Sequence, residues 1–363
     1  MKTIDRERAI RLLTEFNAVN GVSGDEGRVA DLLEKYLAPI TDEISRDVIG
    51  NIVFVKNGRD PDVRVMLSAH MDEIGFMVSD IDDKGYVSLV PVGYHIANIL
   101  VNQNITIRTD RGDVPGVIGA GKPIHELLTD PKGSKPFEWS DIRVDVGAKS
   151  AEEASALGVR PGDFANMEKE SRVLNGKLFS GKAVDNRAGL VCMLLAMELI
   201  ADEVPGAQIH ACGTVQEEIG LKGAEVLVRG VKPDYAICID GGIGSISGEL
   251  DDKARRFYLG KGPGIELYDW CTDTCAGNIV PKQMVRALEA AAEKEGVPYQ
   301  YSIMIDGGTD ACAIMYGNHG VLTGGISLPM KNLHTTIGLV DIDDVTNGAV
   351  LLARYLLDLD VTR

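Results

Sequence analysis

The stretch Val215-Gln216-Glu217-Glu218-Ile219-Gly220 decides how the rest of the chain is read, because two adjacent carboxylates end an apolar run. Residues 209–215 are rich in small and β-branched side chains and follow Pro205-Gly206, which predicts a buried strand. We expect both glutamates at its C-terminal end, where successive side chains point to opposite faces. One glutamate could then bind a metal ion while the other faces a substrate. An ordinary charged turn between strand and helix is the alternative.

The segments on either side of this strand alternate between helix and strand patterns. Apolar residues recur at helical spacing in residues 4–18, 26–38, 221–229, 280–295 and 342–358. Strand patterns mark residues 51–55, 63–69, 235–239, 299–305 and 321–326. This alternation predicts an α/β fold with a mostly parallel mixed sheet flanked by helices.

Two helix starts carry polar residues that could serve as caps. Ser23 or Asp25 is expected to cap the helix over 26–38. Residues 188–200 are apolar on nearly all sides, which predicts a buried helix, and Asp185 and Asn186 stand at its N-terminus. Asp185 could therefore be a cap, a metal ligand or both.

Residues 76–167 have a different texture from the rest of the chain. Short alternating strands, such as those at 86–90 and 105–108, are separated by glycine-containing turns, and no long amphipathic helix is evident. We predict an inserted small β-barrel-like domain here. Residues 1–75 and 168–363 would then form the second, larger domain.

Length and charge limit the classes of protein that fit. A chain of 363 residues can bury a large core and favours two domains. The formal net charge of −17 repels phosphate backbones and anionic lipid surfaces, so we expect no nucleic-acid and no membrane partner. The charged N-terminal residues do not resemble a signal peptide, and no apolar run is long enough to span a bilayer. A cytoplasmic location is therefore expected.

The six cysteines are expected to be free thiols. They are scattered, several lie inside apolar runs, and no secretory signal accompanies them. Cys271 and Cys275 are four residues apart, but no second pair or nearby histidine completes a zinc site.

Five imidazole or carboxylate residues stand at turns that follow apolar segments: His70, Asp185, Glu218, Asp240 and His334. These ligand types suit zinc, cobalt or manganese, and they can hold two ions if one carboxylate bridges them. Three carboxylates against two divalent cations leave a residual charge of about +1, which favours activation of a water molecule near neutral pH. Taken singly, each residue has an ordinary reading as a core histidine, a surface charge or a helix cap.

His70 is the member with the most specific context. Asp72 follows it by two positions, so on an extended strand the two side chains share a face. The carboxylate can then hold the free N–H of the imidazole, as partners of metal-binding histidines do.

Four motifs resemble those of the tetrahedral (TET) aminopeptidases, a family of di-metal exopeptidases also known as glutamyl aminopeptidases or endoglucanase homologues. They run in order through nearly the whole chain and begin with Ala69-His70-Met71-Asp72-Glu73-Ile74-Gly75-Phe76 and Gly181-Lys182-Ala183-Val184-Asp185-Asn186-Arg187-Ala188-Gly189. The others are Gln216-Glu217-Glu218-Ile219-Gly220-Leu221-Lys222-Gly223-Ala224 and Gly307-Gly308-Thr309-Asp310-Ala311.

The resemblance implies a zinc-exopeptidase-like fold and a metal-dependent aminopeptidase acting on short peptides. It places His70 and Asp240 on one metal ion, Glu218 and His334 on the other, and Asp185 between them. Asp72 would orient His70, and Glu217 would be the general base. The inserted domain of the family mediates assembly into large particles, commonly dodecamers, so a homo-oligomer is implied.

The chain departs from the family pattern around the expected substrate pocket. Lys331-Asn332 precedes His334 where the family usually has Arg-Tyr, Gly338 stands where it usually has a glutamate, and Gly241–Ser245 and Gly93-Tyr94-His95-Ile96 are also unusual. Lys331 could favour an acidic side chain or be a solvated charge. His95 could reach the active site or be an ordinary surface or interface histidine. Substrate preference therefore stays open.

Other functions are weighed against this one. A deacylase or carboxypeptidase of the same superfamily would use a similar metal site, and a non-catalytic scaffold would keep only the fold. Glycoside hydrolysis needs two carboxylates that face one bond and stand about 5–9.5 Å from each other. Neighbouring strand residues point to opposite faces and do not provide this arrangement.

Overall fold

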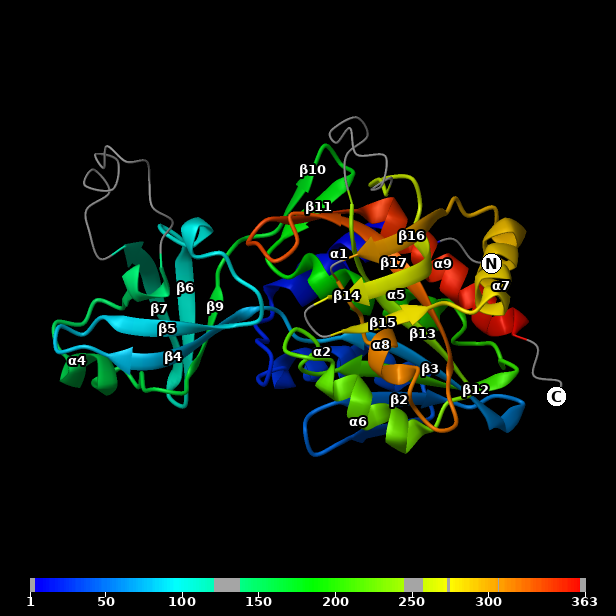
Figure 1. Cartoon of the computed structure of the whole chain (residues 1–363), viewed down its shortest axis with the longest axis horizontal. Coiled ribbons are helices and arrows are strands. Elements are labelled where there is room, and N and C mark those ends of the chain that lie inside the picture. The colour runs from blue at the N-terminus through cyan, green and yellow to red at the C-terminus, as the bar shows by residue number, and fades with distance from the viewer. Residues whose placement is uncertain (1–3, 121–137, 245–256, 273–274, 306, 360–363) are drawn as a thin grey trace.

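The computed structural model describes residues 4–120, 138–244, 257–272, 275–305 and 307–359. It consists of a large sheet with helices on both faces and a separate β-barrel at one end of the molecule (Figure 1). None of the helices in these ranges is long and apolar enough to cross a membrane.

The large sheet is mixed, with parallel strands at its centre and antiparallel strands on its flanks. Its order is β1 (Glu43–Arg46), β2 (Ile52–Lys56), β12 (Ala207–Thr214), β3 (Asp60–His70), β13 (Tyr235–Ile243), β17 (Leu322–Lys331), β18 (Gly338–Asp341), β11 (Leu178–Gly181) and β10 (Arg172–Leu174). β14 (Gly264–Cys271) also pairs with β17, and it carries β15 (Ala276–Ile279) and β16 (Gln300–Ile305). The predicted α/β class with a mixed sheet is confirmed, and its parallel part is β12, β3, β13 and β17.

Helices cover the two faces of this sheet unequally. One face packs against α1 (Arg6–Ala18), α2 (Gly27–Leu37), α5 (Val184–Leu199), α7 (Lys282–Glu295) and α9 (Ile342–Asp358). The other face packs against α6 (Lys222–Val231) and α8 (Ala311–Ile314). Because strand residues alternate, Leu67 and Ala69 of β3 face the first group whereas Met66 faces the second. The 3₁₀ turn η1 (Ala38–Ile40) follows α2.

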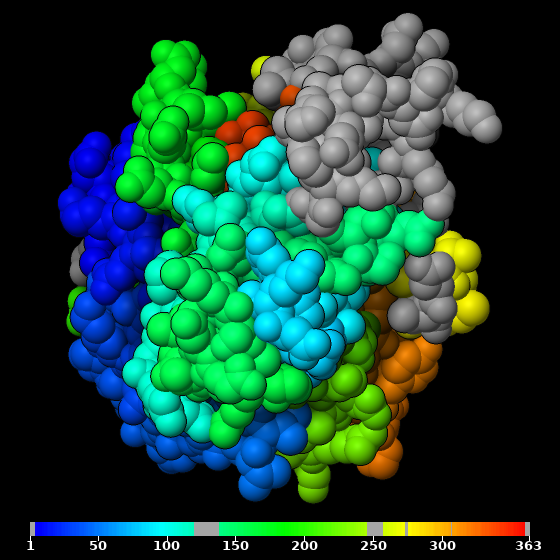
Figure 2. All heavy atoms as spheres, turned by 90° about the vertical axis from the view of Figure 1, so that its left-hand side faces the viewer, coloured from blue at the N-terminus to red at the C-terminus, as the bar shows by residue number. Residues whose placement is uncertain are grey.

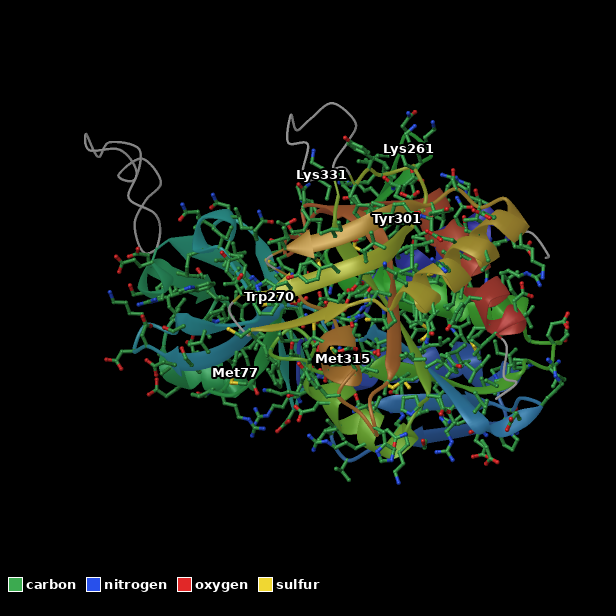
Figure 3. The ribbon with its side chains drawn as sticks, turned by 45° about the vertical axis from the view of Figure 1, so that its right-hand side comes forward. Met77, Lys261, Trp270, Tyr301, Met315 and Lys331 are labelled. Carbon is green, nitrogen blue, oxygen red and sulfur yellow. The ribbon has the colours of Figure 1, made fainter. Side chains whose placement is uncertain are left out.

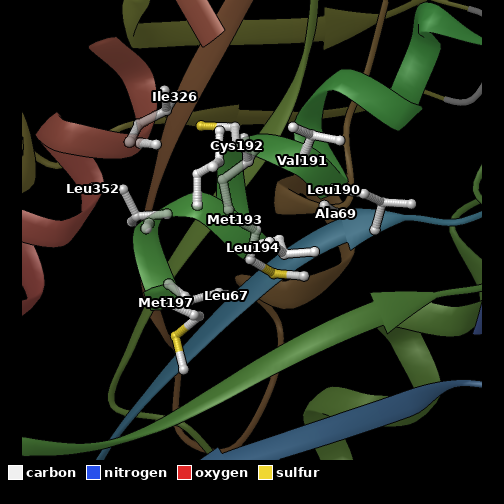
Figure 4. Packing of buried hydrophobic residues seen from close by; sticks show 14 of the residues in the cluster. Leu67, Ala69, Leu190, Val191, Cys192, Met193, Leu194, Met197, Ile326 and Leu352 are labelled. Atoms are coloured by element: carbon white, nitrogen blue, oxygen red, sulfur yellow. The ribbon is translucent and has the colours of Figure 1, made fainter. Parts of the chain in front are cut away.

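The helix predicted over residues 188–200 is buried as expected. In α5, the side chains from Ala188 to Met197 are at most 2 % exposed. They pack against Leu67 and Ala69 of β3 and against Leu352 of α9 (Figure 4). A helix that is apolar all round is stable only in such a fully enclosed position.

The inserted segment forms a closed six-stranded barrel. Its order is β4 (Gly75–Ile81), β5 (Val87–Val92), β8 (Ile142–Asp145), β7 (Gly112–Ala120), β6 (Asn104–Thr109) and β9 (Phe164–Met167). Short turns of helix, namely η2 (Ala97–Ile99), η3 (Trp139–Asp141) and α4 (Ala151–Ala156), connect the strands. The barrel has its own buried core, and Figure 2 views the molecule from this side.

The expected cap of α2 is wrong. Its N-cap is Glu26, which makes no side-chain hydrogen bond to the helix. Ser23 is buried and instead donates its hydroxyl to the carboxylate of Asp72 at 2.6 Å. Asp25 does not cap the helix either, because its carboxylate forms an ion pair with Arg108 of the barrel.

All six cysteines lie in the described part of the chain and are free thiols. This agrees with the expectation from their scattered positions.

Candidate metal centre

Four neighbouring parallel strands bring the candidate site together at their C-terminal ends. β3 ends on His70, Asp240 lies near the end of β13, and the loops after β12 and β17 carry Glu218 and His334. Asp185 comes from the start of α5. In an open α/β sheet this edge is where ligands bind.

The five predicted ligands form two groups that share Asp185. In the first, Nε2 of His70 lies 3.2 Å from Oδ1 of Asp185 and 3.5 Å from Oδ1 of Asp240. In the second, Nε2 of His334 lies 3.5 Å from Oδ2 of Asp185 and 3.3 Å from Oε2 of Glu218. The donor atoms of each group lie within 4.8 Å of one another, so each group could hold one ion.

The electrostatics of the centre fit a cation-binding role. Burial, with a contribution from Asp185, raises the pKa of Glu218 to about 8 and that of Asp240 to about 6. Burial alone would lower the pKa of His334, but Asp185 and Glu218 raise it to about 9. These carboxylates are therefore crowded and poorly solvated, and divalent cations would stabilise their charged forms. Imidazole and carboxylate donors suit zinc, cobalt or manganese.

The two glutamates lie beyond the strand and not on it, which corrects the predicted geometry. β12 ends at Thr214, Gln216 has a φ of 55°, and Glu217 and Glu218 belong to the following loop. The alternation of strand faces therefore does not separate their side chains. They nevertheless diverge: Oε2 of Glu218 is next to His334, whereas Oε2 of Glu217 lies 4.0 Å from Nε2 of His70.

Asp72 holds this loop in place from a fully buried position. Its Oδ1 accepts the backbone N–H of Glu217 at 3.0 Å, and its Oδ2 accepts that of Glu218 at 3.1 Å. Its Oδ1 also lies 3.4 Å from Nδ1 of His70, although the nearer acceptor for that nitrogen is the backbone carbonyl of Asp72 at 3.1 Å. The expected proximity of Asp72 to His70 is thus present, and its bonds to the glutamate loop were not foreseen.

The start of α5 shows that Asn186, and not Asp185, acts as the cap. Oδ1 of Asn186 accepts the backbone N–H of Gly189 at 3.0 Å, and its Nδ2 donates to the carbonyl of Ile239 at 2.8 Å. The side chain of Asp185 does not cap the helix, and its two carboxylate oxygens point to His70 and His334. The Asp185-Asn186 peptide bond is cis.

A buried ion cluster beside the centre was missed by sequence reasoning. Nζ of Lys182 lies 2.5 and 2.7 Å from the two carboxylate oxygens of Glu73, and the fully buried Arg187 lies 3.5 Å from the same carboxylate. Glu73 and Lys182 line the cleft that also exposes Asp185, Glu218 and His334. All three charged residues stand within the quoted motifs, and this was the only sequence signal for them.

The unusual residues near the expected pocket lie in different surroundings. The half-buried ring of His95 stacks on Phe76 of the barrel core, with ring centroids 4.3 Å apart. The ring of Tyr94 lies 6.3 Å from that of His334, next to the centre. Lys331 is the last residue of β17 (Figure 3).

The fold and the two adjoining ligand groups define a peptidase of the zinc-exopeptidase type. The family model of the M42 glutamyl aminopeptidases matches residues 50–351, and the chain belongs to this family. The resemblance to the TET aminopeptidases is thereby confirmed, and the protein is a hydrolase acting on peptide bonds.

Relatives and solved structures agree with this assignment. The chain is 32 % identical over 345 residues to the lysyl aminopeptidase of Pyrococcus furiosus, covering 93 % of each chain. It is similar to aminopeptidase APDkam598 of Desulfurococcus kamchatkensis, with 34 % identity, a TM-score of 0.91 and coverage of 98 % and 96 %. The TET1 peptidase of Pyrococcus horikoshii, which can assemble into a tetrahedron or a large octahedral shell, gives 31 % identity, a TM-score of 0.84 and coverage of 97 % and 100 %.

Proposed function

We propose that this protein is an aminopeptidase that removes N-terminal residues from short peptides with the help of two divalent metal ions per subunit. The observation that carries the proposal is the placement of Asp185, which offers one carboxylate oxygen to each of two ligand groups. His70 and Asp240 complete one group, and Glu218 and His334 complete the other. The ions would be zinc, cobalt or manganese, because the donors are imidazoles and carboxylates.

When bound, such ions act as Lewis acids that polarise the scissile carbonyl and lower the pKa of water. The protein residue that we assign to proton transfer is Glu217. Its carboxylate lies beside the first group without belonging to either. From there it can accept a proton from the attacking water and return it to the leaving amine.

Asp72 is assigned an orienting role. It lies against Nδ1 of His70, which leaves Nε2 directed to Asp185 and Asp240. The same carboxylate fixes the backbone of Glu217 and Glu218. One side chain therefore sets the position of a candidate ligand and of the candidate base.

We further propose that the protein is a cytoplasmic homo-oligomer, namely a dodecamer, in which residues 76–167 mediate assembly and residues 1–75 and 168–363 carry catalysis. The shell-forming TET1 peptidase supports the oligomer, because the chain matches it over nearly its whole length. The net charge of −17 supports the absence of nucleic-acid and membrane partners. Sizing of the native particle by light scattering tests the subunit number.

The central test compares peptides with free and acetylated N-termini. We expect release of the N-terminal residue from free peptides only, loss of activity with a chelator, and recovery with cobalt, zinc or manganese. Cleavage of acetylated peptides would instead favour a deacylase or a carboxypeptidase. Cellulase activity that resists chelation would contradict a peptidase site altogether.

A further inference from the structure

Asp310 lies behind the candidate metal centre and has no part in the mechanism above. It precedes α8 and its side chain is 1 % exposed. Its Oδ2 accepts hydrogen bonds from the hydroxyls of Ser68 and Thr214, the latter at 2.7 Å. Within the described ranges, no hydrogen-bond donor reaches its Oδ1. The residue belongs to the Gly307-Gly308-Thr309-Asp310-Ala311 motif, which the proposed mechanism leaves without a role.

The two hydroxyl donors belong to neighbouring parallel strands that lead into the centre. Ser68 stands two residues before His70 in β3, and Thr214 is the last residue of β12. Thr214 and His70 are paired in register across the two strands. The chain continues from Thr214 into the loop of Glu217 and Glu218. The Asp310 carboxylate therefore joins the strand end that carries a candidate ligand to the strand end that precedes the candidate base.

Asp310 also lies on the face of the sheet toward which the side chain of His70 projects. Side chains two residues apart on a strand share a face, so Met66, Ser68 and His70 project from β3 toward the side covered by α6 and α8. Asp310 begins α8 on that side. A substitution of Asp310 would therefore disturb Ser68 and, through the same strand face, the position of His70.

Packing alone does not account for a carboxylate at this position. A buried carboxylate oxygen without a donor is unfavourable for folding, and Ser68 and Thr214 need only a single acceptor. The hydroxyl pair is itself fully buried, so each hydroxyl depends on Asp310 as its acceptor. The unpaired oxygen of Asp310 lowers the stability of the fold, whereas the shared acceptor oxygen fixes the distance between the ends of β3 and β12.

We propose that Asp310 is a positioning residue of the metal centre: by accepting hydrogen bonds from Ser68 and Thr214, it holds the ends of β3 and β12 together and fixes His70 relative to Glu217 and Glu218. This inference rests on the proposed function, because it assigns Asp310 a task at that same site. Asp310 is not a catalytic residue, because its carboxylate belongs to neither of the two candidate ligand groups and does not line the cleft.

The test uses Asp310→Ala in the full chain, which removes the acceptor, with Asp344→Ala as the matched control. Asp310→Asn is the conservative variant, because its amide keeps one acceptor oxygen for both hydroxyls. Asp344 is also 1 % exposed, and its carboxylate accepts the backbone N–H groups of Gly260 and Gly262 instead of strand-end hydroxyls. Each variant is titrated with Co²⁺ against a chelating dye, its visible Co²⁺ spectrum is recorded, and kcat, KM and the unfolding temperature are measured.

We expect Asp310→Ala to weaken Co²⁺ binding by about 10- to 100-fold and to alter the spectrum, because Ser68 and Thr214 lose their shared acceptor. Asp310→Asn should retain most of the affinity. We expect kcat of Asp310→Ala to fall while KM changes little, because the substrate does not touch Asp310. Asp344→Ala should leave Co²⁺ affinity and spectrum unchanged, even if its unfolding temperature drops. Unchanged Co²⁺ affinity and spectrum in Asp310→Ala, or equal losses in both alanine variants, would overturn the proposal.

Ser68 supplies a second, milder test if Asp310→Ala does not fold. Ser68→Ala should weaken Co²⁺ binding, and Ser68→Thr should restore it because the hydroxyl returns; unchanged binding in Ser68→Ala would overturn the proposal. The outcome is distinct from failure of the proposed function, since Co²⁺ binding is measured without substrate. If the wild-type protein bound Co²⁺ but released no N-terminal residues, the proposed aminopeptidase activity would be contradicted. The Co²⁺ affinities of the variants would still decide whether Asp310 positions the centre.

Discussion

Oδ1 of Asp72 accepts a hydrogen bond from the backbone N–H of Glu217 at 3.0 Å. The same carboxylate lies against His70 through one oxygen and binds the N–H of Glu218 and the hydroxyl of Ser23 through the other. The candidate ligand and the candidate base are therefore held by one buried side chain. The position of His70 relative to Glu217 therefore depends on the charge of Asp72 and on its two acceptor oxygens.

Asp72→Asn should impair both stability and turnover. An amide offers one acceptor oxygen, so at least one buried N–H in the glutamate loop loses its partner, at a cost of about 1–3 kcal/mol. We expect a lower unfolding temperature and a kcat reduced by about 10- to 100-fold. Ser23→Ala is the control, because it removes one donor and leaves both oxygens of Asp72. Wild-type kcat in Asp72→Asn would contradict the assigned role.

Glu217→Gln and Glu218→Gln should separate proton transfer from metal binding. Glu217 lies outside both ligand groups, so Glu217→Gln should retain both metal ions and lose turnover by about 10²-fold or more. Glu218→Gln replaces a candidate carboxylate ligand with a neutral amide and should lower metal occupancy, measured by elemental analysis after dialysis. Full activity in a metal-loaded Glu217→Gln variant would show that another group is the base.

Asn186→Ala should destabilise the protein at the start of α5. It removes a helix cap and leaves the buried carbonyl of Ile239 without its donor, a combined cost of about 2–4 kcal/mol. Because Ile239 precedes Asp240, metal affinity should fall as well. Asp5→Ala is a suitable control, since Asp5 caps α1 at an exposed position. Denaturant unfolding and Co²⁺ titration measure the two effects.

His95 should make stability depend on pH in the acidic range. Burial lowers the pKa of His95 to about 4, so the folded state resists protonation that the unfolded chain accepts at about pH 6.5. The stabilising contribution is present above pH 6.5 and is lost as the pH falls toward 4, by at most about 1.4 kcal/mol per unit.

His95→Phe keeps a ring against Phe76 but removes the titrating group. The difference in unfolding free energy between wild type and His95→Phe should therefore shift in favour of the variant as the pH falls from 6.5 to 4. The exposed His319→Gln serves as control. A difference that stays constant over this range would contradict the buried, neutral state of His95.

The positions of the candidate ligands were largely predictable because apolar runs mark the strands. His70 and Asp240 follow such runs directly, and the ends of parallel strands meet at one edge. The barrel was predictable as a region, since its short alternating strands contrast with the helical segments around it. That the barrel closes depends on pairings between strands far apart in the chain, such as β4 with β9, which no local pattern reports.

The glutamate loop shows where local reasoning fails. Strand periodicity was extended to Glu217 and Glu218, but β12 stops at Thr214. The loop is instead shaped by Asp72, 145 positions away for Glu217. Asp310 is a second case, because its partners are 96 and 242 positions distant. The sequence indicated which residue types gather at the site, whereas the links among them follow from the tertiary structure.

The distribution of the candidate ligands along the chain has a consequence for biosynthesis. His70 ends β3, whereas His334 follows β17. A nascent chain on the ribosome does not contain the complete second ligand group until synthesis has passed His334. We therefore expect hydrolytic competence to appear only after β17 and the loop that follows it have been translated.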